Sequence, residues 1–257
     1  PGATLELTNT FSWTAGATGT NALLANAGLL RVQLAGTVTL APPLEQHGEL
    51  TLERGTLFLS AASGFRQWAG LTTLAGGALR FGQPGTLFGG TLTGTGTITG
   101  TLTNHARLNP GPGPGQLTVA GTYIQAADGT LELELAGTNP GVDFDRLAVT
   151  GPARLDGRLA LAGVNAIPPA PGQSFRSLTA TTRTGTFAEV TAAFATPRPG
   201  VIYTNNAATI VTFRDDWTLP APPVTPIDEL APFAFSCVPT VPLPSFQTLA
   251  YSVTGAP

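Results

Sequence analysis

Residues 91–108 read TLTGTGTITGTLTNHARL, and this run carries the clearest structural signal in the chain. Every odd position from Thr91 to Thr103 is threonine, whereas the even positions between them are leucine, isoleucine or glycine. A period of two is typical of a β-strand with one buried and one solvated face. A single strand of this length would be exceptional, since strands average about five or six residues. The glycines permit bends, so the run predicts several short strands that turn corners while keeping one face inward.

The same alternation recurs elsewhere. Leu131, Leu133 and Leu135 alternate with Glu132 and Glu134. Residues 147–161 alternate in the same way, with these residues predicted to face inward: Leu147, Val149, Gly151, Ala153, Leu155, Gly157, Leu159 and Leu161. No segment shows a convincing helical period. We therefore expect an all-β chain whose residues 1–214 form a parallel β-solenoid of roughly 20 residues per coil.

An antiparallel sandwich or barrel is the alternative fold, because it also contains short alternating strands. It is disfavoured because hairpin signals such as Asn-Gly do not separate the strands.

The composition excludes several classes of protein. With 42% hydrophobic and only 11% charged residues, the chain is not a solvated disordered polymer. A net charge of −3 gives no electrostatic basis for binding nucleic acid or an anionic membrane. No apolar run approaches the roughly 18 residues of a membrane span. The single cysteine, Cys237, has no internal disulfide partner, and we interpret it as a small buried hydrophobe, with an intermolecular bridge or a reactive thiol as alternatives.

Several blocks appear in a characteristic order after residue 89. They are residues 94–100, 109–125, 129–135, 145–151, 153–159 and 185–187, followed by a strand pair around 201–203 and 210–213. In this order they resemble the autotransporter-associated β-helix repeats of secreted and surface proteins of bacteria. The resemblance implies a right-handed parallel β-helix on an exported, extracellular or cell-surface protein. It implies no enzymatic activity, because such repeats mostly form shafts and passengers.

Residues 215–257 differ in composition from the rest of the chain. They include nine prolines, which favour an extended chain without ladder hydrogen bonds. They also include apolar residues such as Phe233, Phe235 and Tyr251, which disfavour a simple solvated linker. We expect an extended Pro-rich C-terminal tail that either caps the solenoid or adds a strand to a neighbouring subunit, and we favour the neighbouring subunit.

Few residues are candidates for catalysis. His47 and His105 are the only histidines, and neither lies in a nucleophile motif or near metal-ligand spacing. We expect His105 at an exposed corner. Glu132 and Glu134 face outward two residues apart, about 7 Å, which suits acid–base chemistry, but we interpret them as a solvated strand face.

Two other motifs invite a binding role. Asp143 and Asp145 offer oxygen ligands for calcium, yet we expect Asp145 to cap a turn or to pair with Arg146. Residues 109–115, NPGPGPG, lack the lysine and helix of a phosphate loop, so we predict a stiff corner. We therefore expect no catalytic residues, no cofactor and no metal.

The sequence favours a structural or adhesive extracellular solenoid, a subunit or shaft segment of a surface fibre that self-associates through its ends and its tail. A host surface or a glycan is a further possible partner. The alternative is a carbohydrate-binding or polysaccharide-cleaving β-helix, which should concentrate acidic, aromatic and basic residues along one strip. A minor alternative is ice binding through threonine ladders, which requires the same threonine column on successive coils.

Overall fold

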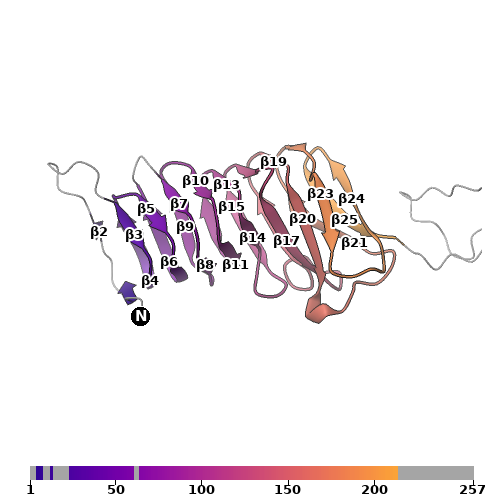
Figure 1. Ribbon diagram of the computed structural model, residues 1–257, viewed down its shortest axis with the longest axis horizontal. Helices are drawn as coiled ribbons and strands as arrows, with labels where there is room; N and C mark the ends of the chain where they lie inside the picture. Colours follow the sequence, from indigo (N-terminus) through magenta and orange to yellow (C-terminus); the bar gives the residue numbers. More distant parts are fainter. Residues whose placement is uncertain (1–3, 8–11, 14–22, 61–63, 214–257) are drawn as a thin grey trace, which may run out of the picture.

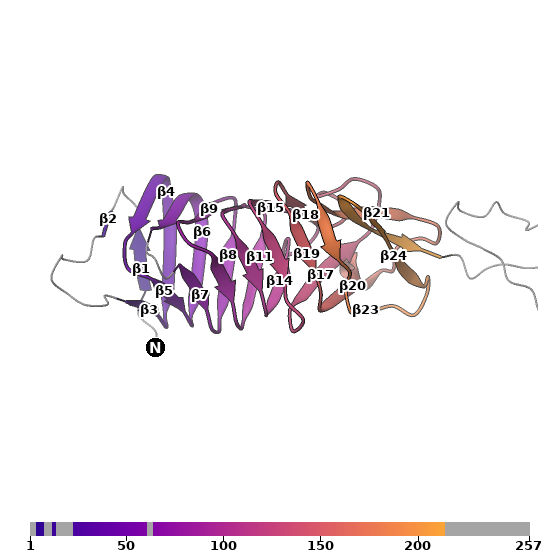
Figure 2. The ribbon, with the colours of Figure 1, turned by 90° about the horizontal axis from the view of Figure 1, so that it is seen from above.

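The computed structural model describes residues 4–7, 12–13, 23–60 and 64–213. In these residues the chain winds into coils that stack along one long axis, from indigo to orange in Figure 1. Each coil contributes up to three short strands, and each strand pairs in parallel with its equivalent in the next coil, as the view from above shows (Figure 2). The predicted all-β parallel solenoid is confirmed. The tail at 215–257, Cys237 included, lies outside the described residues.

Three faces run along the stack. The first face contains β1 (Thr4–Leu7), the start of β4 (Leu29–Leu40), the start of β6 (Glu49–Leu59), β8 (Leu71–Leu74), β11 (Thr91–Gly94), β14 (Arg107–Asn109), β17 (Thr130–Leu135), β20 (Arg158–Gly163) and β23 (Glu189–Ala192). The second contains β2 (Ser12–Trp13), the ends of β4 and β6, β9 (Ala78–Phe81), β12 (Thr97–Thr99), β15 (Gln116–Ala120), β18 (Arg146–Val149) and β21 (Ser174–Thr179). The third is an eight-stranded sheet of β3 (Leu24–Asn26), β5 (Leu44–Gln46), β7 (Phe65–Gln67), β10 (Gly85–Leu87), β13 (Leu102–Asn104), β16 (Tyr123–Gln125), β19 (Ala153–Leu155) and β22 (Arg183–Gly185).

The threonine run folds as its alternation predicts. It forms the four strands β11, β12, β13 and β14, with corners between them. Its inward aliphatic residues are fully buried: Leu92, Ile98, Leu102 and Leu108. Gly94 forms one corner with φ +118°, where a Cβ would lie 2.1 Å from the Leu74 carbonyl oxygen. Each buried leucine contributes about 1.5–3 kcal/mol through removal of apolar surface from water, so the aliphatic columns are the main source of stability.

A column of buried amides accompanies the aliphatic ones at the end of the third face. Asn104 and Gln125 lie in register, and Asn104 Nδ2 donates to Gln125 Oε1 at 3.1 Å and to the Thr130 carbonyl at 3.1 Å. Asn104 Oδ1 accepts from the Ala106 N–H at 3.0 Å. Two coils lower, Gln67 Nε2 donates to the carbonyl oxygens of Gly89 and Thr91. These amides satisfy backbone groups at a corner that has no regular ladder partner.

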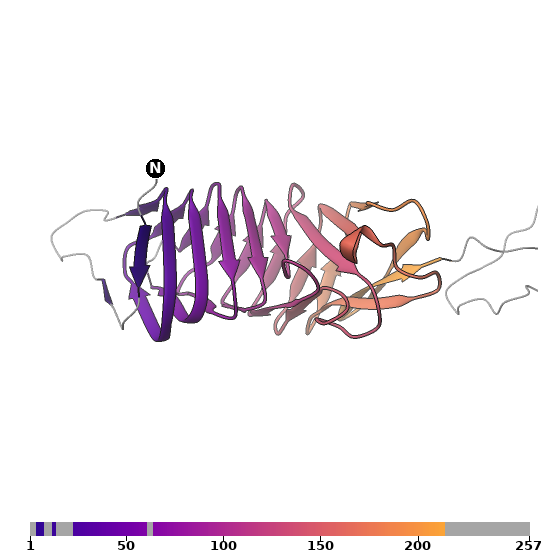
Figure 3. The ribbon, with the colours of Figure 1, turned by 90° about the horizontal axis from the view of Figure 1, so that it is seen from below.

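Coil length increases in the C-terminal half, beyond the length expected from the sequence. On the first face Thr51 pairs with Thr73, whereas on the second face Gln116 pairs with Arg146, a clearly longer step along the chain. The extra residues lie in the connections 136–145 and 164–173, the second of which contains the 3₁₀ turn η1 (Val164–Ala166). These longer connections project from the red-to-orange half of the stack in Figure 3. The alternation continues through the strands, so the added length changes the loops and leaves the coil core intact.

The last coil ends in two different ways. On the second face, β21 pairs antiparallel with β25 (Ala207–Thr212), which pairs with β24 (Pro199–Thr204), so a hairpin covers this edge. This hairpin contains the strand pair expected around 201–203 and 210–213. On the first face, β20 is the only ladder partner of β23 among the described strands. Among the described strands, the first face therefore ends in an open edge at β23, and the third face ends in one at β22.

Candidate functional site

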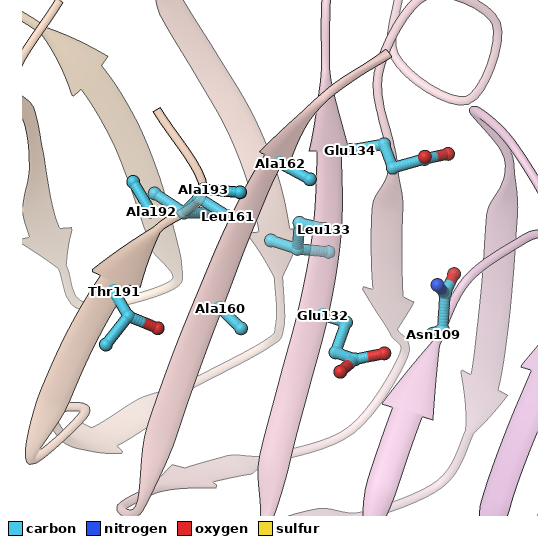
Figure 4. A pocket seen from close by; sticks show the side chains of 10 residues that line it. All are labelled: Asn109, Glu132, Leu133, Glu134, Ala160, Leu161, Ala162, Thr191, Ala192 and Ala193. Carbon is cyan, nitrogen blue, oxygen red and sulfur yellow. The ribbon is translucent and has the colours of Figure 1, made fainter. Parts of the chain in front are cut away.

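A groove of about 470 Å³ lies on the outer side of the first face, over β14, β17, β20 and β23. Figure 4 shows the polar ends of Asn109, Glu132 and Glu134 along one side of it. The methyl groups of Ala160 and Ala162 form its floor. The groove therefore has a floor of small residues, Ala160 and Ala162, and a polar wall formed by Asn109, Glu132 and Glu134.

Strand register explains this arrangement. Asn109 lies one coil below Glu132 by extension of the Arg107 pairing, while Glu132 pairs with Ala160 and Ala160 pairs with Thr191. Alternation turns all four side chains outward. The two coils that follow the glutamates carry only small outward side chains at these positions, alanine on β20 and threonine on β23. The groove is the space left above these small side chains, beside the longer glutamates.

Two ion pairs flank the groove. Arg107 Nη2 donates to Glu132 Oε1, and Arg158 Nε lies 3.8 Å from Glu189 Oε2. Arg158 Nε also donates to Thr191 Oγ1 at 3.3 Å. Within the described residues the Glu134 carboxylate has no hydrogen-bond or ion-pair partner. The sequence predicts that Glu132 and Glu134 form a solvated strand face. In the structure both side chains are half-buried and line the groove.

Glu132 and Glu134 present two carboxylates to the groove, and the Arg107 guanidinium holds one of them, that of Glu132. The two carboxylates are neighbours on one strand, and no tyrosine, histidine or lysine lines the groove beside them.

Asp145 lies behind the groove and is fully buried. Its carboxylate accepts from the N–H of Gly115 at 2.9 Å and from the N–H of Glu134 at 2.8 Å. Burial raises the pKa of Asp145 to about 7, opposed by these two hydrogen bonds. Asp145 was expected to cap a turn or to pair with Arg146, and both expectations were wrong. Its carboxylate joins the start of β15 to β17, and Arg146 Nη2 donates to Thr179 Oγ1.

Asp143 caps a separate turn. Its Oδ2 accepts from the backbone N–H of Thr138 and of Asn139 at 2.9 Å each, and from the Asn139 side chain at 2.8 Å. The N–H bonds from Asn139 and Thr138 lower the pKa of Asp143. Within the described residues no group of three or more histidine, cysteine, aspartate or glutamate side chains could hold a metal ion.

Both histidines lie at the corner between the third and first faces. His105 is one-third exposed, and its Nδ1 lies 2.7 Å from Asp128 Oδ1. Its ring stacks on Phe88 at 5.8 Å, and Phe88 stacks on Trp68 at 4.4 Å. Trp68 and Phe88 are each 43% exposed. This stack runs along the rod, so the Phe88 ring has both faces against its neighbours and turns its edge to solvent.

His47 is exposed and directly follows the buried Gln46. Trp68 occupies the equivalent position one coil later, because it directly follows the buried Gln67. Trp68, Phe88 and His105 are well separated along the chain, so the sequence alone does not indicate that their rings stack. The coil repeat brings them together. The stack stands at the corner between the third and first faces, and the groove lies beyond it on the first face over β14, β17, β20 and β23.

Threonines form one short column on the first face. Thr51, Thr73 and Thr93 are in register on successive coils, but Asn109 follows Thr93 and Arg31 precedes Thr51. The neighbouring outward column reads Leu71, Thr91 and Arg107. On the second face Thr37 pairs with Thr56 and Thr97 pairs with Thr118, but Ala78 separates the two pairs. These short runs on separate faces do not provide the broad array of adjacent threonine columns that ice binding requires.

Residues 109–115 form a turn between β14 and β15, with Asn109 Oδ1 accepting from the Gly111 N–H at 2.9 Å. The predicted corner is confirmed. In the part of the chain that the structure describes, no helix is long and apolar enough to cross a membrane.

The open edge of β23 is the second notable surface. Leu131, Leu159 and Val190 form one inward column through β17, β20 and β23. The first two are fully buried, but Val190 is 38% exposed because no described strand covers it. Sequence alternation predicts which residues face inward, and it does not indicate where the stack ends.

No protein-family model matches the chain, and no curated protein matches it either. The resemblance to autotransporter-associated repeats therefore stays an expectation that rests on the residues quoted for it.

Proposed function

We propose that the chain is a non-catalytic structural shaft of an extracellular bacterial surface protein or fibre, and that it associates through its coil end. The observation that carries the proposal is the edge of β23, which no described strand pairs and beneath which Val190 is exposed. An edge strand with apolar surface is a ready template for another strand.

The two sides of the last coil support this assignment. On the second face the hairpin β24–β25 closes the edge, and Tyr203 Oη accepts from the Phe187 N–H at 3.1 Å. The Arg183 guanidinium lies 5.0 Å from the Tyr203 ring centre. The hairpin closes the second face and leaves the edges of β22 on the third face and β23 on the first face without a further described ladder partner. Of these two edges, β23 carries the exposed apolar side chain of Val190, so we assign the joint to β23, where a partner would add in the direction of the rod axis.

Replacement of Val190 by lysine tests the joint. Sedimentation velocity of the full chain over a concentration series should show association in the wild type and weaker association in Val190→Lys, because edge lysines oppose strand pairing. Val142→Lys is the matched control, since Val142 is 71% exposed on a loop away from the strand edge. Far-UV circular dichroism checks that both variants keep the β-sheet spectrum. Equal association of all three proteins would exclude the β23 edge as the joint.

A further inference from the structure

The groove on the first face has the size and shape of a small-molecule site. Its volume of about 470 Å³ lies within the roughly 300–1,000 Å³ of ligand pockets. The floor is flat because Ala160 and Ala162 stand on a sheet face and Thr191 continues it on the next strand. A flat apolar floor suits a ligand with a flat apolar face.

Polar groups along the groove have unused hydrogen-bonding capacity. Among the described residues, Glu134 has no side-chain partner, and Glu132 engages Arg107 through Oε1 alone. Asn109 uses Oδ1 for the Gly111 N–H, and its Nδ2 donates to no described group. Thr191 Oγ1 accepts from Arg158 and keeps its proton to donate. The wall thus offers several carboxylate acceptors and the Asn109 amide donor, and Thr191 adds a second donor from the floor.

Acceptors outnumber donors, so a suitable ligand carries many hydroxyl donors. The charge along the wall is negative, because Arg107 compensates Glu132 while the Glu134 carboxylate has no cationic partner among the described residues. Coulomb repulsion therefore disfavours carboxylated, sulfated or phosphorylated ligands. A pyranose ring combines a flat C–H face with hydroxyl groups at its rim.

The geometry points to a binding site for a neutral oligosaccharide in this groove, with sugar rings on Ala160 and Ala162 and hydroxyl groups bonded to Glu134, Asn109 and Thr191. The site does not depend on end-to-end association: the groove uses outward side chains, whereas the joint uses the strand edge and Val190.

Isothermal titration calorimetry of the full chain tests the site with three neutral probes, the linear tetrasaccharides of glucose, mannose and galactose. Tetragalacturonate is the anionic probe and tetralysine is the peptide probe. At least one neutral tetrasaccharide should bind with a dissociation constant below about 1 mM, and tetragalacturonate should not bind.

Three variants locate the binding. Ala162→Leu fills the floor and Glu134→Ala removes an acceptor, and each should weaken binding by about tenfold or more. Thr73→Leu is the control, because Thr73 faces outward on the same face two coils away from the groove. It should leave the affinity within about twofold of the wild type.

Failure of all three neutral probes would overturn the proposal, as would tetralysine binding in their absence. Equal affinity of Ala162→Leu and the wild type would also overturn it. None of these outcomes bears on the sedimentation test of the coil end, so the two proposals fail separately.

Discussion

Truncation of Asn104 to alanine tests whether the buried amide column holds the corners of the coils. Asn104 is fully buried and its side chain joins three segments: Gln125 on the next coil, the Thr130 carbonyl and the Ala106 N–H. Removal leaves the Ala106 N–H without its acceptor, at about 1–3 kcal/mol. Loss of the remaining bonds and of side-chain volume adds about 1–2 kcal/mol. We expect a total loss of about 3 kcal/mol in the free energy of unfolding.

Urea unfolding followed by far-UV circular dichroism measures this loss, provided that the slope of the transition is unchanged. Asn104→Leu separates packing from hydrogen bonding, because leucine already occupies this column one coil lower, at Leu87. It fills the space but leaves the same N–H unpaired, so it should still lose about 1–3 kcal/mol. Thr103→Ala, on the outward side of the same strand, should lose under about 1 kcal/mol. A loss below about 1 kcal/mol for Asn104→Ala, or a more stable Asn104→Leu, would refute the reasoning.

Two further predictions concern stability. Because burial raises the pKa of Asp145 to about 7 from 3.8, the folded protein retains a proton that the unfolded chain releases. The associated stability is fully present below pH 3.8 and is lost as pH rises through 7, by up to about 4 kcal/mol. Asp145→Asn should flatten this dependence in urea titrations from pH 4 to 8, and an unchanged slope would contradict the assignment. Gly94→Ala should cost more than about 1 kcal/mol in thermal unfolding, because its φ is positive and a Cβ would meet the Leu74 carbonyl; Gly113→Ala, with open space around its Cβ position, controls for the clash.

Much of the fold follows from alternation in the sequence. The parity of Leu92, Ile98 and Leu102 predicts their burial, because a strand can bury only one face without reversing its register. The same parity places Gln67 and Gln125 inward, but residue type disfavours burial of an amide. Corner carbonyls of neighbouring coils, which are distant in sequence, supply part of the compensating hydrogen bonds. Buried side chains supply the rest, Thr72 for Gln67 and Asn104 with Tyr123 for Gln125.

The surface features are harder to predict, since they depend on stacking between coils. The groove requires Ala160 to lie beside Glu132 from the preceding coil, and the aromatic stack requires Trp68 to lie beside Phe88. Coil length sets both pairings. Coil length increases where the connections between strands lengthen. The alternation within a strand does not predict the length of these connections.

Electron microscopy of the negatively stained full chain over a concentration series tests the central claim most directly. If the open edge of β23 is a joint, rods should lie end to end and their length should increase with concentration. Single short rods of constant length at every concentration would contradict the claim that this solenoid is an associating structural shaft.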